Sequence, residues 1–130
     1  MILVDTSVWI ANLRGEDTEP VRKLGSIEPA RQRILVGDLI LSEVLMGARD
    51  EAHAARLRRD MQTFPIVSLV GVDVAEEAAR NWRRLRALGI TVRGTIDMLI
   101  GTFCILHGHT LLHGDRDFLP MQRHLGLAAL

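Results

Sequence analysis

The chain has 130 residues, of which 48% are hydrophobic and 25% are charged. This size and balance are typical of one globular domain with its own core, so we expect a single domain over residues 1–130 and no second domain. The chain carries 16 basic and 16 acidic residues. Because its net charge is zero, any site for nucleic acid must come from local clustering of charge.

No apolar run approaches the roughly 18 to 20 residues that span a bilayer. The N-terminus, MILVDTSVWI, has neither a basic leader nor a small-residue cleavage site. These features predict a soluble, cytoplasmic protein that does not enter a membrane. The single cysteine, Cys104, lies among apolar residues in GTFCILHG, which excludes an intramolecular disulfide and favours a core position over thiol catalysis.

The first half of the chain alternates between strand and helix patterns. ILVD, residues 2–5, is a short apolar run closed by an acid and predicts a strand. Residues 6–15 repeat apolar side chains at helical spacing, and residues 16–29, which carry Pro20, Gly25 and Pro29, predict one short helix with loose ends. RILVG, residues 33–37, predicts a second buried strand. DLILSEVLMGA, residues 38–48, predicts a helix that Asp38 opens and that ends near Gly47.

The second half continues the same alternation. The patterns predict a charged helix over 50–62, a third strand over 65–70, a long helix over 72–88 that stops at Gly89, an apolar helix over 95–108 that Thr95 could cap, a fourth strand over 109–115, and a final helical turn or two over 117–126. Alternating strands and helices favour an α/β fold, in which helices flank both faces of a parallel sheet.

Two acids close predicted strands. In an open parallel sheet the ligand crevice lies beyond the carboxyl ends of the strands, so Asp5 and Asp115 are expected to point into it. The alternative for each is helix capping, because Asp satisfies free amide groups well at the start of a helix.

Two further acids interrupt apolar helices. Glu43 lies between Leu41 and Val44, and Asp97 lies near the start of the most hydrophobic helix. A buried carboxylate is costly unless it is paired, hydrogen-bonded or bound to metal. Exposure at the edge of a helix face is the alternative for both acids.

The sharper hypothesis is that Asp5, Glu43, Asp97 and Asp115 converge, with Asp117 beside them. Two carboxylates about 4 Å apart repel by roughly 4 kcal/mol at an effective dielectric constant near 20, so such a cluster implies bound cations. Oxygen ligands select hard ions such as Mg²⁺ or Mn²⁺. One or two such ions could activate water and stabilise charge on a scissile phosphate, which is nuclease chemistry.

Four blocks in this order, ILVDTSVWI, LILSEVLMGA, TIDMLIGT and LLHGDRDF, closely resemble the PIN-domain ribonucleases, in particular the VapC-like toxins of VapBC toxin–antitoxin pairs. The resemblance spans nearly the whole chain, from Ile2 to Phe118. It implies that four acids bind metal, namely Asp5, Glu43, Asp97 and Asp115. It also implies that Asp117 is an auxiliary acid and that Thr6 or Ser7 holds a hydroxyl near the metal.

The resemblance further implies a Rossmann-like PIN fold with about four to five strands, dependence on Mg²⁺ or Mn²⁺, and cleavage of RNA. It also implies a homodimer and inhibition by a VapB-like antitoxin that covers the active site. The chain departs from the family pattern at His113 and Gly114, where relatives often carry a small polar residue, and at Leu119, where a further acid is common.

Among the basic residues, Arg116 lies between two candidate metal ligands and is the first choice for contacting substrate phosphate or an inhibitory partner, with Arg93 second. Arg80, Arg83 and Arg84 share a helix face, for which a solvated surface is the simpler interpretation than an RNA-binding stripe.

The histidines at 107, 109 and 113 lack regular ligand spacing, so we interpret them as hydrogen-bonded residues and not as metal ligands. Trp9 and Trp82 lie at apolar helical positions, which favours core packing or a subunit interface over base stacking.

Two other functions fit parts of the sequence. A phosphotransfer domain would use Asp5 as a nucleophile, but the second acid expected beside it and the late lysine expected to bind phosphate are both missing. A non-catalytic PIN-like module that binds RNA or a protein would be favoured by the loss of a metal-site acid, and all four acids are present.

Overall fold

The computed structural model describes residues 1–130 and forms one parallel sheet of four short strands. The strands are β1 (Ile2–Val4), β2 (Ile34–Gly37), β3 (Ile66–Val67) and β4 (Thr110–Leu112). Their spatial order is β3-β2-β1-β4, and every neighbouring pair is parallel. The predicted α/β class with a parallel sheet is therefore confirmed.

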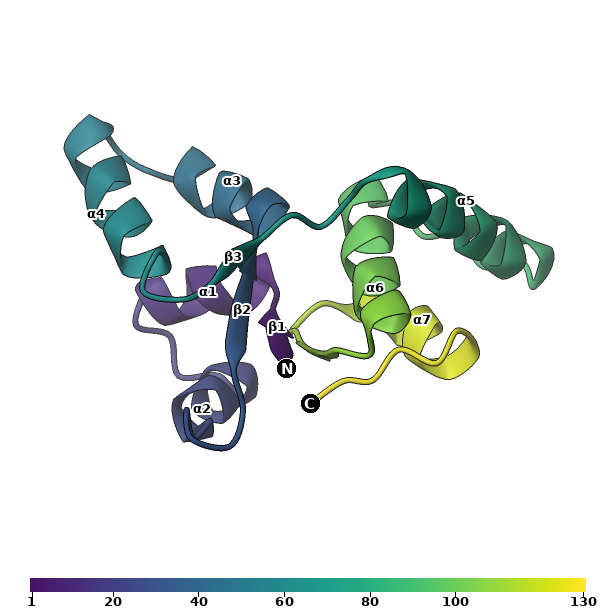
Figure 1. Ribbon diagram of the computed structural model, residues 1–130, viewed down its shortest axis with the longest axis horizontal. Helices are drawn as coiled ribbons and strands as arrows, with labels where there is room; N and C mark the ends of the chain where they lie inside the picture. The colour runs from purple at the N-terminus through teal and green to yellow at the C-terminus, as the bar shows by residue number, and fades with distance from the viewer.

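Seven α-helices and one 3₁₀ turn surround the sheet. They are α1 (Thr6–Leu13), α2 (Glu19–Ser26), α3 (Asp38–Met46), α4 (Glu51–Met61), α5 (Val72–Ala87), α6 (Thr95–His107), the 3₁₀ turn η1 (Arg116–Phe118) and α7 (Leu119–His124). In the view of Figure 1, α1 to α4 lie to one side of the strands and α5 to α7 lie to the other. The helices thus cover the sheet in two groups, as its apolar strands require.

The central strand is apolar on both faces. Ile2, Leu3 and Val4 of β1 are each at most 1% exposed, and β1 pairs with β2 on one side and β4 on the other. A strand with no solvated face reads as a continuous apolar run, which explains why β1 has no alternating pattern. Asp5 therefore directly follows a strand that is buried on both faces.

Two strands are shorter than the sequence predicts. β3 ends at Val67, because the chain then turns so that the Leu69 N–H donates to Asp38 Oδ1 at 3.1 Å. β4 ends at Leu112, and the Gly114 N–H beyond it donates to Ser7 Oγ at 3.3 Å. In both places a side-chain oxygen from a neighbouring helix accepts a hydrogen bond from a backbone N–H that would otherwise be free to extend the strand pairing.

The prediction that Thr95 caps α6 is wrong. The capping position is Gly94, which makes no side-chain capping bond, and Thr95 is already the first helical residue. A Cβ atom at position 94 would lie 2.8 Å from Asp97 Oδ2. The start of α6 is thus packed closely against the carboxylate that it carries.

The outer edge of β4 is covered by the end of the chain. The Leu111 N–H donates to Ala128 O at 2.9 Å, and the Leu130 N–H donates to Leu111 O at 3.0 Å. Residue 129 accordingly forms a parallel bridge with Leu111.

One buried polar contact holds α5 against α6. Asn81 Nδ2 donates to Thr102 Oγ1 at 3.1 Å, and the two residues are 2% and 0% exposed. Neither α5 nor α6, nor any other helix, is long and apolar enough to cross a membrane.

Replacing Thr102 with Val should destabilise the protein by about 1–3 kcal/mol, because the substitution keeps the shape of the side chain but leaves the Asn81 amide buried without its acceptor. Urea unfolding would measure the change. The exposed Thr91 offers a matched control, for which Thr91→Val should change stability by less than about 0.5 kcal/mol. Equal stability of the two variants would contradict the role given to this contact.

Candidate functional site

The candidate site lies at the point where the chain changes the side of β1 on which it adds strands. From β1 the chain continues to β2 on one side, while β4 pairs with β1 on the other side. Ligand crevices of open α/β sheets form at such a switch point, beyond the carboxyl ends of the strands. Asp5 directly follows β1, and Asp115 lies three residues after β4.

Three carboxylates form the tightest group at this point. Oxygen atoms of Asp97, Asp115 and Asp117 all lie within 4.8 Å of one another, and each residue is half-buried. Asp97 stands in the first turn of α6, whereas Asp115 caps η1 and Asp117 lies within it. Each pair repels by about 3–4 kcal/mol at an effective dielectric constant near 20. Asp117, expected as an auxiliary acid, therefore belongs to the tightest group.

Asp5 is held beside this group by the start of α1. It is only 4% exposed, and its Oδ2 accepts from Ser7 Oγ at 2.6 Å and from the Ser7 N–H at 3.1 Å. The capping role that the sequence left open is thus real. Burial raises the pKa of Asp5, the bonds from Ser7 and Thr6 oppose the rise, and the charge of Asp115 adds to it.

Glu43 approaches the site from α3. Its Oε1 accepts a hydrogen bond from Thr6 Oγ1 at 2.8 Å, and its side chain is half-buried. Because Thr6 directly follows Asp5, this bond brings Glu43 to the end of β1. Glu43 is therefore not turned to solvent at the edge of its helix.

The charges of the other four acids act on Asp97. Its pKa is raised from 3.8 to about 7, first by burial and then by the charges of the other four acids, in the order Asp5, Asp115, Asp117 and Glu43. The carboxyl group of Asp97 is thus affected by acids that come from the end of β1, from α3 and from the segment after β4.

The donor chemistry fits a hard divalent cation. The group of Asp97, Asp115 and Asp117 offers only carboxylate oxygens, with no cysteine or histidine among its members, and such ligands suit Mg²⁺ or Mn²⁺.

Cys104 is fully buried, and burial raises its pKa to about 12. The prediction that Cys104 is a core residue is confirmed.

The residues predicted to contact substrate lie in different surroundings. The hydroxyls of Thr6 and Ser7 are both bonded to site acids. Arg116 is exposed between Asp115 and Asp117 and takes part in none of the ion pairs of the chain. Arg93 is exposed and lines a groove between α5 and α6.

The other basic and aromatic residues follow the simpler interpretations. Arg80 and Arg84 pair with Glu77 at 2.7 and 3.5 Å, as expected of a solvated helix face. Trp9 is 5% exposed, and its ring lies 5.3 Å from that of Phe64. Trp82 is half-buried with the Arg86 guanidinium 5.3 Å from its ring centroid.

Of the three histidines that were expected to be hydrogen-bonded, only His113 has a side-chain hydrogen bond. His107 and His109 pack on Phe103, with ring centroids 4.7 and 5.5 Å away. His113 Nε2 lies 2.7 Å from Gln122 Oε1. The contact between His113 and Gln122 has no signal in the sequence, because no local pattern links the end of a strand to a later helix. The close packing of Gly94 on Asp97 does have a visible signal, which is a glycine three residues before a candidate acid.

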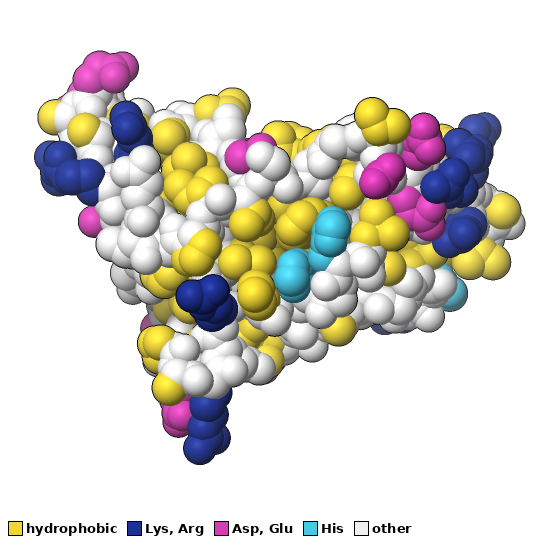
Figure 2. Space-filling view, viewed as in Figure 1, with side chains coloured by type: hydrophobic (Ala, Val, Ile, Leu, Met, Phe, Trp, Pro, Cys, Tyr) yellow, Lys and Arg dark blue, Asp and Glu magenta, His cyan; other side chains and the backbone are white.

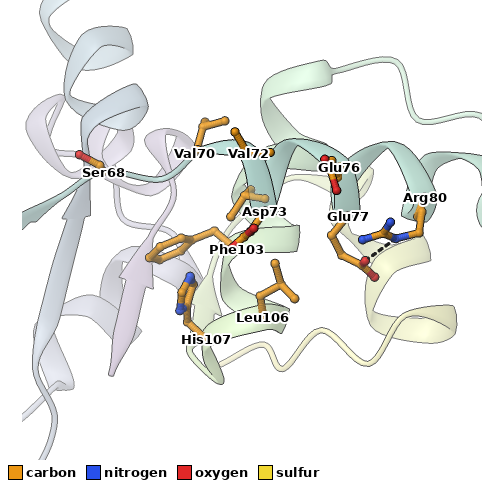
Figure 3. Close-up of a pocket in the computed structure, with 12 residues that line it drawn as sticks. Ser68, Val70, Val72, Asp73, Glu76, Glu77, Arg80, Phe103, Leu106 and His107 are labelled. Atoms are coloured by element: carbon orange, nitrogen blue, oxygen red, sulfur yellow. Dashed lines mark hydrogen bonds and ion pairs between the residues drawn. The ribbon is translucent and has the colours of Figure 1, made fainter.

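A large hollow elsewhere on the molecule is not this site. A cavity of about 810 Å³ lies between the N-terminal half of α5 and the C-terminal half of α6. Figure 3 shows Asp73 and Glu77 of α5 on one side of it and Phe103 and His107 of α6 on the other, and Figure 2 shows apolar side chains gathered in the hollow centre of the same face. Asp97 and His107 are about 15 Å apart along α6. None of the five acids lines this cavity.

Comparison with known proteins agrees with this geometry. Ribonuclease VapC11 of Mycobacterium tuberculosis is 35% identical over 132 residues, which cover 99% of this chain and 97% of that protein. A crystal structure of FitAcB from Neisseria gonorrhoeae superposes with a TM-score of 0.79 at 20% identity, covering 100% of this chain and 96% of the other.

A toxin–antitoxin complex from Klebsiella pneumoniae superposes with a TM-score of 0.70 at 21% identity, covering 91% of this chain and 90% of the other. The PIN domain family matches residues 2–123, a span that contains all five site acids. A phosphotransfer domain is therefore the wrong alternative, and the chain belongs to the PIN domain family.

Proposed function

We propose that this protein is a Mg²⁺- or Mn²⁺-dependent endoribonuclease of the cytoplasm and the toxin component of a type II toxin–antitoxin pair. The observation that carries the proposal is the group of Asp97, Asp115 and Asp117, whose carboxylate oxygens lie within 4.8 Å of one another at the switch point of the sheet. The relative that is 35% identical over almost the whole chain is itself named a ribonuclease, which supports the same activity here.

We assign the five acids as the metal-holding and catalytic groups. Asp97, Asp115 and Asp117 supply the closest oxygens, and Asp5, directly after β1, and Glu43, on α3, complete the ligand set. One or two divalent ions, when bound, neutralise the cluster, activate water and stabilise charge on the scissile phosphate.

The hydroxyl and basic residues around the acids have separate roles in this proposal. Ser7 and Thr6 orient Asp5 and Glu43 through their hydroxyls. Arg116 is free of ion pairs and exposed beside the acids, so its guanidinium is the group we assign to an RNA phosphate. Arg93, which is exposed and lines the groove between α5 and α6, is the second choice for a phosphate contact.

We further propose that a cognate VapB-like antitoxin covers the acids. The likeness of the fold to a toxin–antitoxin complex supports this partner. On this chain, a groove of about 240 Å³ adjoins the site and is lined by Ser7, Val8, Ala11, Pro20 and Gly114, among others. A segment lying in this groove would pass directly beside the hydrogen bond that joins Ser7 to Gly114.

The protein is also proposed to form a homodimer, and the surface of α5 favours one arrangement. An apolar groove of about 770 Å³ runs along its Ala75, Ala79 and Trp82 side and against α6. Glu76 precedes Ala79 by about one turn and Arg83 follows it by about one turn. Neither charge takes part in an ion pair within the chain. Two antiparallel copies of α5 would place each Glu76 beside Arg83 of the other copy, as an isologous interface requires.

Replacing Asp97 with Asn should lower metal-dependent cleavage of a structured RNA by at least about 100-fold, because one carboxylate is lost from the tightest group. Gel analysis of the RNA with and without Mn²⁺ would measure the loss. The exposed Asp60, on α4, gives the matched control Asp60→Asn, which should cleave normally. RNA binding without cleavage in the unaltered protein would instead identify a non-catalytic PIN-like module.

The metal-free protein should lose stability as the pH rises from about 4 to about 7. The folded-state pKa of Asp97, about 7, lies above its ordinary value of 3.8, so the folded protein binds more protons in that interval. Above pH 7 the penalty is complete, and Asp97→Asn should relieve on the order of 1–2 kcal/mol after allowance for solvent screening of a half-exposed group.

Thermal melts of the two proteins at pH 5 and pH 8 measure this difference. A hundredfold excess of Mn²⁺ over its Kd should then stabilise the unaltered protein by about 2.7 kcal/mol and should stabilise Asp97→Asn far less. If the difference in stability between the two proteins does not widen with pH, burial and neighbouring charge do not raise the pKa of Asp97.

Reversing one charge on α5 should weaken the dimer, and reversing both should restore it. Glu76→Arg or Arg83→Glu alone places like charges opposite each other, whereas the double variant again pairs opposite charges. Sedimentation velocity measures the state of each variant, with Glu51→Arg on exposed α4 as a control for the change in net charge. A dimer that survives both single reversals would exclude this surface.

A further inference from the structure

The segment that carries Asp115 and Asp117 is tied to the rest of the fold through His113. Nδ1 of His113 accepts from the Asp115 N–H at 3.2 Å, and Nε2 lies 2.7 Å from Gln122 Oε1 on α7. Because a backbone N–H can only donate, Nδ1 carries no proton, and the proton sits on Nε2. Nε2 therefore donates to Gln122, and both ring nitrogens are used.

Packing fixes the plane of the same ring. The His113 ring lies 4.9 Å from that of Phe118, centroid to centroid, at an interplanar angle of 49°. Phe118 is fully buried and directly follows Asp117. The imidazole is thus held by a strand end, a buried aromatic ring and a helix at once.

The opposite side of the segment is held by Ser7. The Gly114 N–H donates to Ser7 Oγ, which in turn donates to Asp5 Oδ2. Within the segment, Asp115 Oδ1 accepts from the Asp117 N–H at 2.9 Å. The direction of the Asp115 carboxylate consequently depends on the backbone at positions 115 to 117. The first N–H group of this backbone, that of Asp115, donates to His113.

We propose that His113, held by Gln122, is a positioning residue that sets the placement of the Asp115 and Asp117 carboxylates relative to Asp97. The proposal rests on the proposed function only in giving those carboxylates a metal to hold. His113 touches neither metal nor RNA in this role. It acts through the Asp115 amide, in the manner of the outer hydrogen-bonding partners that orient metal ligands.

The two functions of the ring can be separated by substitution. His113→Ala removes both hydrogen bonds. His113→Asn offers a side-chain oxygen that can accept the same amide two residues on, as in an Asx turn, but it is too short to reach α7. Gln122→Ala keeps the acceptor and removes only the bond to Nε2. His124→Ala, an exposed histidine of α7, is the matched control.

Amide hydrogen exchange in the metal-free protein is the first measurement. His113→Ala should speed exchange at the Asp115 and Asp117 amides by at least about 10-fold, while the β1 amides stay protected. Gln122→Ala should change exchange in the same direction by less. His113→Asn should recover protection at Asp115, and His124→Ala should match the unaltered protein.

Titration with Mn²⁺ is the second measurement. His113→Ala should weaken Mn²⁺ binding by about 10-fold to 100-fold, and His113→Asn should recover most of it. Unaltered exchange and affinity in either His113→Ala or Gln122→Ala would overturn the proposal. Failure of His113→Asn to recover them would also overturn it, since ring packing alone would then explain the effect.

These outcomes are distinguishable from failure of the proposed function. Exchange is measured without metal or RNA, so it reports the positioning role even if the unaltered protein neither binds Mn²⁺ nor cleaves RNA.

Discussion

The repulsion among negative charges gathered at the ends of β1 and β4 is the interaction on which the site depends. Three carboxylates meet within 4.8 Å, and Asp5 and Glu43 act on the same point. A flexible chain would relieve this repulsion by moving the acids apart. Here Asp5 is held at the end of a buried strand, Asp97 in the first turn of a helix, and Asp115 and Asp117 in a turn with its own hydrogen bonds. The acids therefore stay close together, and either a proton on Asp97 or a bound cation relieves their repulsion.

The polar contacts around the acids carry this restraint. Ser7 bonds Asp5 and the segment after β4 with one hydroxyl, and Thr6 bonds Glu43 with another. Both residues belong to the first turn of α1, whose start is fixed by β1. A short sequence, DTS, thus connects three of the chain segments that supply acids.

Much of the fold follows from patterns visible in the sequence. Continuous apolar runs located β1 and β2, and helical spacing located α3, α5 and α6, because burial on one face or two is a local property of the chain. The convergence of Asp5 and Asp115 followed from the rule for parallel sheets, since it depends only on topology. The assignment of Glu43 and Asp97 to the same site needed the resemblance to a family as well.

The remaining features depend on contacts between distant residues. The early end of β3 follows from the bond between Leu69 and Asp38, which lie 31 positions apart. Gly94 rather than Thr95 is the capping residue of α6, and the Asp97 carboxylate occupies the space that a side chain at position 94 would need. The link between His113 and Gln122 likewise joins a strand end to a helix, and no periodic pattern records such a pair.

The two edges of the sheet are unequal. The backbone of residues 128–130 already occupies the hydrogen-bonding groups on the free side of β4, whereas β3, at the other margin, has only two residues. A strand from another molecule would therefore find the free edge of β4 already paired, and β3 too short to offer it a long edge for hydrogen bonds. The free margin of β4 is thus closed by the chain's own backbone, which leaves no unpaired strand edge on that side of the sheet.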